Sequence, residues 1–117
     1  MKYLKKIIKH DIPGLLELEL DAFTDFRGEI WSSYEDCDLF PSFVEDKITI
    51  STKNVLRGLH GDFETGKLIS CIHGEIFLVV VDVRGKNKMI KTFNLSDKNP
   101  KLIFVPPGCL NGHLCLS

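Results

Sequence analysis

The stretch Leu16-Glu17-Leu18-Glu19-Leu20 alternates apolar and acidic residues and follows the turn signal Ile12-Pro13-Gly14. A period of two is typical of a β-strand, because successive side chains of a strand point to opposite faces of the sheet. We therefore predict a half-buried strand over residues 16–20. This short segment already favours a β-protein over a helical one.

The same kind of pattern recurs along the whole chain. The run Ile76–Val81 is apolar at every position, which predicts a central strand covered on both faces. Around residues 35–46 we expect at most one helical turn and a loop. Many short strands separated by Gly, Pro, Asn and Asp turns are typical of a sandwich or a barrel. The further expected strands lie near residues 29–34, 47–51, 54–60, 67–73, 75–83, 90–95 and 101–105.

Length and charge limit the possible classes of protein. The chain has 117 residues, which suits a single domain over residues 1–117. Fifteen Lys and Arg against sixteen Asp and Glu give a net charge of −1, which argues against a nucleic-acid-binding surface. No apolar run approaches the roughly 20 residues of a membrane helix. The N-terminus also has no apolar signal core. We expect a cytoplasmic protein.

The four cysteines give no metal-binding or redox motif. They stand at positions 37, 71, 109 and 115, and no two form a Cys-x-x-Cys pair. We expect free thiols, with Cys109 and Cys115 as the one pair that could bridge. No Cys or His pair has the spacing of a structural zinc site.

The segment around Arg57-Gly58-Leu59-His60 is the first candidate for chemistry. Strict alternation would send Arg57 and His60 to opposite faces, but a bulge at Gly58 would turn both to one side. The alternative is an edge arginine beside a hydrogen-bonded core histidine. Lys67 begins the next strand and should point the same way as Ile69. It would then be either solvated at the rim or directed into a barrel mouth.

Two glycine turns present further candidates. Arg27 precedes Gly28 among aromatic residues and could bind a phosphate beside a flat ring, or simply pack over Trp31. The rigid turn Pro106-Pro107-Gly108 delivers Asn111 and His113 onto a final strand. Either of them could contact a ligand, or be a satisfied polar group at the start of a strand.

These motifs, taken in order, resemble the dTDP-4-dehydrorhamnose 3,5-epimerase family over residues 11–117. The resemblance implies an all-β fold, a cupin-type antiparallel β-barrel or jelly roll. It also implies a nucleotide-diphosphate sugar as substrate, a homodimer, and neither metal nor cofactor. The residues that carry it are Asp25-x-Arg27-Gly28, Val55-Leu56-Arg57-Gly58-Leu59-His60, Lys67-Leu68-Ile69, Gly74, Val81-Asp82-x-Arg84, Leu95-Ser96 and Pro106-x-Gly108-x-x-Asn111-Gly112.

The resemblance also implies roles for individual residues. The family epimerises a 4-keto-hexose at C3 and C5, and His60 matches its catalytic base. Lys67 matches the residue that stabilises the enolate oxygen. Arg27 and Arg57 match the arginines that hold the diphosphate and the sugar. The remaining expected substrate contacts are the hydroxyl pair Thr49 and Ser51, together with Asn111.

The chain also departs from the family pattern. Glu45, Lys47 and Asp62 stand where the family has other polar residues, and Asn111 replaces a histidine. The Asn-Gly-His form is similar to the branch that acts on GDP-linked 4-keto-heptoses.

Family members also continue beyond the position of Ser117, where their proton-donating tyrosine and the aspartate that pairs with the base lie. We therefore expect a C-terminally incomplete barrel that exchanges the substrate proton faster than it inverts the centre. Three alternatives stay open: a non-catalytic nucleotide-sugar-binding cupin, an inactive fragment, and an enzyme that inverts one centre or moves the keto group.

Overall fold

The computed structural model describes residues 1–117 and consists entirely of strands, turns and loops. No helix is present, so no helix could cross a membrane. The all-β class predicted from the sequence is confirmed. The strands are β1 (Leu4–Lys9), β2 (Leu16–Leu20), β3 (Phe23–Asp25), β4 (Gly28–Ile30), β5 (Leu56–His60), β6 (Lys67–Ile69), β7 (Glu75–Asp82), β8 (Met89–Ser96), β9 (Lys101–Val105) and β10 (Cys109–Cys115).

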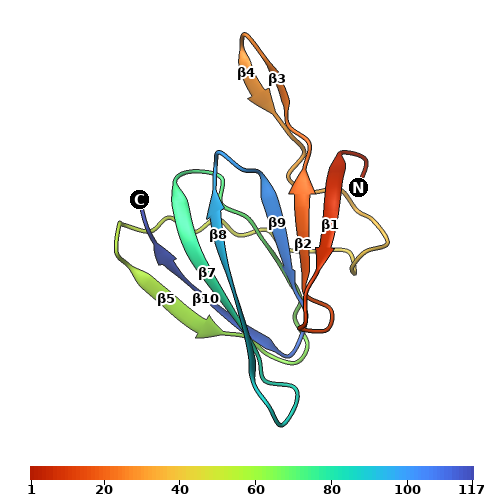
Figure 1. Cartoon of the computed structure of the whole chain (residues 1–117), viewed down its shortest axis with the longest axis vertical. Coiled ribbons are helices and arrows are strands. Elements are labelled where there is room, and N and C mark those ends of the chain that lie inside the picture. Colours follow the sequence, from red (N-terminus) through yellow and green to blue (C-terminus); the bar gives the residue numbers. More distant parts are fainter.

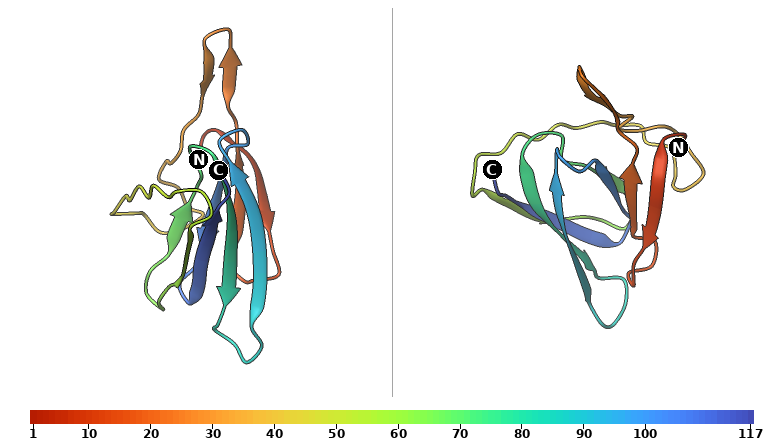
Figure 2. Two further views of the ribbon diagram at one scale, coloured as in Figure 1. Left: turned by 90° about the vertical axis from the view of Figure 1, so that its left-hand side faces the viewer. Right: turned by 45° about the horizontal axis from the view of Figure 1, so that its top comes forward.

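Two four-stranded antiparallel sheets face each other (Figure 1). One has the order β1-β2-β9-β6 and the other β5-β10-β7-β8, so β9 and β10 are inner strands of different sheets. The short hairpin β3–β4 projects away from both sheets, as the side view in Figure 2 also shows. This arrangement leaves β5 and β6 at open edges.

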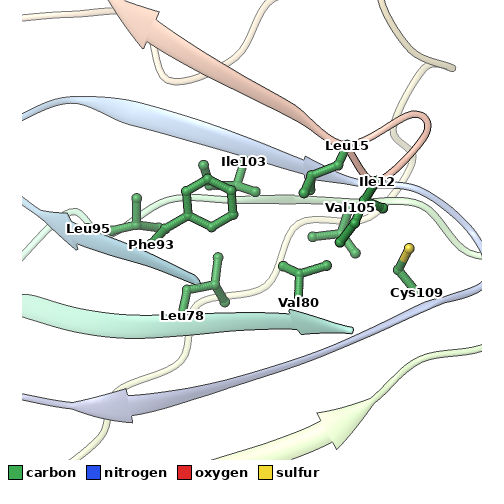
Figure 3. Packing of buried hydrophobic residues seen from close by; sticks show 9 residues of the cluster. All are labelled: Ile12, Leu15, Leu78, Val80, Phe93, Leu95, Ile103, Val105 and Cys109. Carbon is green, nitrogen blue, oxygen red and sulfur yellow. The ribbon is translucent and has the colours of Figure 1, made fainter. Parts of the chain in front are cut away.

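The main core fills the space between the sheets. Figure 3 shows Leu78 and Val80 of β7 pointing toward Ile103 and Val105 of β9, and all four are fully buried. Their burial follows from the alternation of the two strands, which sends every second side chain inward. The core is completed by Ile12, Leu15, Phe93, Leu95 and Cys109.

A second cluster covers the outer face of the β1-β2-β9-β6 sheet. Phe40 stacks on Phe104 of β9 at a centroid distance of 5.2 Å, and both are buried. Leu18 of β2 is fully buried in the same cluster. Residues 35–46, expected as a loop with at most one helical turn, contain no helix. The strand expected near 29–34 ends at Ile30, and the loop over residues 31–43 supplies this cover.

Burial on both faces of β2 corrects the half-buried strand expected over residues 16–20. Leu18 faces the aromatic cover, while Glu17 on the opposite face is only 8% exposed. His10 Nε2 lies 2.9 Å from Glu17 Oε1, and Lys101 Nζ donates to Glu17 Oε2 at 2.8 Å. We call these three residues the Glu17 cluster. Acidic alternation alone does not reveal that such charged partners come from β9 and from the turn after β1.

The motif Val81-Asp82-x-Arg84 holds a turn in place. Arg84 Nε donates to Asp82 Oδ1 at 2.9 Å, and its guanidinium also donates to the carbonyl of Pro13. The hydrogen bond from Arg84 outweighs burial and lowers the pKa of Asp82. This pair ties the end of β7 to the turn that leads into β2.

Several expectations about individual segments need correction. Segment 47–51 is not a strand: no other strand pairs with it, and Ile48 and Ile50 are largely exposed. β1 is a strand that we did not predict. β7 lies between β10 and β8 as expected, but Phe77 and Val79 on its outer face are only half-buried, so the cover on that side is partial.

All four cysteines are free thiols, as expected. Cys109 and Cys115 lie at opposite ends of β10, at the two limits of one extended strand. A strand of that length separates the residues far beyond the ~7 Å limit for Cα atoms joined by a disulfide.

Candidate functional site

The pairing of β5 with β10 is irregular where the predicted site residues lie. Arg57 pairs with His113 and His60 pairs with Asn111, so three residue steps on β5 match two on β10. This is the geometry of a β-bulge. Directly opposed residues of an antiparallel pair point to the same side, so Arg57 and His60 share one face. Of the two alternatives that the sequence left open, the bulge near Gly58 is the one present.

This shared face is the inner one. β10 also pairs with β7, where Asn111 lies opposite Val80 and His113 lies opposite Leu78. Val80 and Leu78 are fully buried between the sheets. The four side chains at the bulge therefore continue the inner wall beyond the apolar core, toward the open edge formed by β5. His60 is exposed at that edge.

Gly58 permits the close approach of β5 to β10. Its φ is +126°, and a Cβ atom built on it would lie 2.5 Å from the Cα of Gly112. A side chain at this position would meet backbone, which cannot move aside as a flexible side chain can. Glycine is therefore required for the local geometry that turns His60 inward.

Lys67 reaches the same place from the opposite sheet. It begins β6 and pairs with the buried Val105 of β9, so it points between the sheets, as predicted from its neighbour Ile69. Its Nζ donates to Asn111 Oδ1 at 2.8 Å and lies 3.4 Å from the carbonyl oxygen of His60. The ammonium group of a residue on one sheet is thus fixed beside the His60 backbone by acceptors on the other sheet.

The loop between these two residues is closed by Asp62. Its carboxylate accepts from the backbone N–H groups of Glu64 and Thr65 at 2.8 and 2.6 Å, and from the Thr65 hydroxyl at 3.0 Å. These hydrogen bonds lower the pKa of Asp62. Asp62, noted in the sequence as a departure from the family, is here the residue that shapes the turn leading from His60 to Lys67.

Arg57 is held at the other end of the wall. Its Nε donates to Ser51 Oγ at 2.8 Å, and its guanidinium also donates to the carbonyl of Ile50 at 3.4 Å. Thr49 lies two residues earlier in the exposed segment and makes no hydrogen bond. Arg27 is separate from this group, on the projecting β3–β4 hairpin, where it pairs with Asp25 at 2.6 Å (Figure 1).

The structure therefore assembles five of the seven predicted site residues. Arg57, His60 and Asn111 lie on the inner wall, Lys67 reaches it from the opposite sheet, and Ser51 contacts Arg57. Arg27 and Thr49 lie outside this group. Two cationic groups and an imidazole on one wall suit an anionic ligand with an acidic C–H bond. No three His, Cys, Asp or Glu side chains gather where a metal ion could bind.

Comparison with known proteins gives the same family over nearly the whole chain. The family model described as dTDP-4-dehydrorhamnose 3,5-epimerase matches residues 9–117. A curated relative with that name from Salmonella typhimurium is 37% identical, over 95% of this chain and 67% of its own length.

Solved structures agree in fold. A dTDP-4-dehydrorhamnose 3,5-epimerase from Sulfolobus tokodaii superimposes with a TM-score of 0.88 at 25% identity, over 100% of this chain and 70% of that one. An epimerase from Legionella pneumophila, solved with dTDP-4-keto-L-rhamnose, gives a TM-score of 0.84 at 32% identity, over 96% of this chain and 65% of that one. The chain thus spans about two thirds of the length of these relatives.

Proposed function

The chain belongs to the dTDP-4-dehydrorhamnose 3,5-epimerase family, and we propose that it is an isomerase acting on a nucleotide-diphospho-4-keto-6-deoxy-sugar. The reaction is epimerisation at C3, C5 or both, next to the ketone at C4. dTDP is the nucleotide in the names of the curated relatives. Such a reaction belongs to the synthesis of rhamnose or a related deoxysugar.

In the proposed reaction His60 is the base. A proton next to a ketone is acidic, and a neutral imidazole within hydrogen-bond reach can remove it. The electron pair of the broken C–H bond moves into a C–C double bond, and the C4 oxygen becomes an enolate. A proton that water delivers to the opposite face of the carbon inverts the centre, and His60 then passes its own proton to solvent. No electron is lost or gained, so the reaction needs no oxidant.

Lys67 would stabilise the enolate. The observation that carries the proposal is the hydrogen bond from Lys67 Nζ to Asn111 Oδ1 at 2.8 Å, beside the backbone of His60. It holds one positive charge next to the base before substrate arrives, and a preorganised charge is worth more than one that must reorient. Arg57, held by Ser51, would bind the anionic diphosphate.

The test is solvent deuterium uptake at C3 and C5 of dTDP-4-keto-6-deoxyglucose, because uptake requires only the base and the enolate. We expect uptake with the wild-type chain and a loss of about 10²–10⁴-fold in His60→Ala. His73→Ala is the matched control, since the His73 side chain is 99% exposed and lies outside the site. Tight binding without uptake at either carbon would instead indicate a non-catalytic sugar-nucleotide-binding protein.

We also propose a homodimer, located in the cytoplasm. β5 leaves unpaired backbone groups at the edge of its sheet, and Leu56 on it is 75% exposed. The projecting hairpin exposes Phe26 almost completely, at 97%. A second copy is the partner that would cover these surfaces, and four free thiols suit a reducing compartment. A stable monomer in sedimentation velocity at micromolar concentration would contradict the dimer.

A further inference from the structure

His113 is a second imidazole on the site wall, and the roles proposed above make no use of it. It lies two residues after Asn111 on β10 and opposite Arg57 on β5. Its other neighbour in the sheet is Leu78 of β7, which is fully buried. The His113 side chain therefore points inward on the same wall as His60.

The imidazole of His113 is available to a ligand. It makes no hydrogen bond within the protein, and no buried nitrogen or oxygen atom of the chain lacks a partner. The nitrogens of this half-buried ring must therefore reach solvent. Burial lowers the pKa of His113, and the charge of Arg57 lowers it further. A neutral ring still offers one N–H donor, and it adds no repulsion to the neighbouring guanidinium.

The position of His113 indicates which part of the ligand it would meet. In the proposed reaction, His60 and Lys67 lie next to the reacting sugar carbons, and Arg57 lies next to the diphosphate. His113 lies one step along the wall from His60, opposite Arg57. Alternate residues of a strand are roughly 7 Å apart. The phosphate attached to C1 is four bonds from C3 or C5, so a diphosphate that begins there extends along the wall from His60 toward His113.

We propose that His113 is a substrate-binding residue that donates a hydrogen bond to the sugar-linked phosphate of the nucleotide sugar, next to Arg57. This inference rests on the proposed function and adds a contact that the family resemblance does not assign. A phosphate oxygen accepts readily from both a guanidinium and an imidazole N–H. Together the two groups would select for a diphosphate over a monophosphate.

The experiment compares dTDP with dTMP, which lacks the second phosphate. We expect His113→Phe to weaken dTDP binding about tenfold, the effect of losing one hydrogen bond to a charged group. Binding of dTMP should be unchanged. His113→Gln keeps an N–H donor and should retain most of the dTDP affinity. His73→Phe is the matched control, because that side chain is fully exposed away from the site.

A second measurement does not depend on any variant being folded. Addition of dTDP to the wild-type chain should shift the side-chain nitrogen resonances of His113, and dTMP should leave them in place. Binding of dTDP without such a shift would overturn the inference and leave the proposed function intact, as would an equal loss of dTDP and dTMP affinity in His113→Phe. A wild-type chain that binds no dTDP would overturn both.

Discussion

Replacement of Glu17 by glutamine should destabilise the fold substantially while keeping the shape of the side chain. The carboxylate is 10% exposed, and its partners His10 and Lys101 are 12% and 19% exposed. Removing one member of a buried charged pair typically costs ~3–5 kcal/mol, because the remaining charge keeps its desolvation penalty. Since Lys101 can still reach some water, we take the lower end and expect a loss of about 3 kcal/mol.

Urea denaturation of Glu17→Gln and the wild-type chain measures this loss directly. The midpoint should fall with an unchanged slope, since the surface exposed on unfolding is the same. Glu19→Gln is the matched control: Glu19 lies two residues along the same strand and forms no ion pair, so we expect a change within about 0.5 kcal/mol. If the two variants proved equally stable, the reasoning about the Glu17 cluster would be refuted.

The pH dependence provides an independent check on the same cluster. Burial tends to raise the pKa of Glu17, but hydrogen bonds from Lys101 and His10 outweigh it and lower the pKa below the ordinary value of 4.5. A group with a lowered folded-state pKa stabilises the fold above its unfolded pKa and loses that contribution as pH falls through the folded value. The difference between wild type and Glu17→Gln should therefore be full at neutral pH and shrink below about pH 4.5. A difference that does not change with acidification would contradict this assignment.

Three further changes test the site and the cover. Lys67→Met should slow deuterium uptake from the 4-keto-sugar by about 10²–10³-fold, because it removes the charge at the enolate, and an unchanged exchange rate would exclude that role. Gly58→Ala should lower the free energy of unfolding by about 3 kcal/mol in urea denaturation, since its φ is +126° and the added Cβ would meet backbone. Gly85→Ala is the control and should be nearly neutral, because a Cβ there would have nothing within 4 Å. Equal effects of the two changes would argue against the close approach of β5 to β10 at Gly58. Phe40→Ala should lower the free energy of unfolding by about 3–5 kcal/mol, because Phe40 is buried. Phe26→Ala, at a site 97% exposed, should leave it almost unchanged. A larger loss in Phe26→Ala than in Phe40→Ala would mean that segment 31–43 does not cover the outer face of the sheet.

The sequence predicts strands best where an apolar pattern coincides with a place inside a sheet that packs against a core. β7 and β9 are rich in apolar residues, and both lie inside a sheet with a core against them. The segment 47–51 has the same β-forming residues but no neighbouring strand, so its propensity has no partner to satisfy. β1 is the reverse case. Its lysines obscure the sequence pattern of a strand, yet its backbone pairs with that of β2.

In the site, too, local features are predictable from the sequence and contacts between distant residues are not. The types and spacing of Arg57, His60 and Lys67 are local features, and they are visible in the sequence. The hydrogen bond between Lys67 and Asn111 joins residues 44 positions apart on different sheets, so it depends on how the sheets face each other. The Glu17 cluster was not predicted for the same reason, since Lys101 is 84 positions away.

The β-bulge between β5 and β10, where three residue steps match two, limits which changes in chain length the site can accept. Deleting one residue between Arg57 and His60 would restore regular pairing and so favour the sheet itself. Regular pairing at the present length would instead turn one of the two side chains outward, because residues three apart on a regular strand face opposite sides. A lineage that lost one codon here would leave Arg57 and His60 two residues apart, and both would still face inward. What the site requires at this point is therefore that both side chains share a face, which either the bulge or a strand shorter by one residue provides.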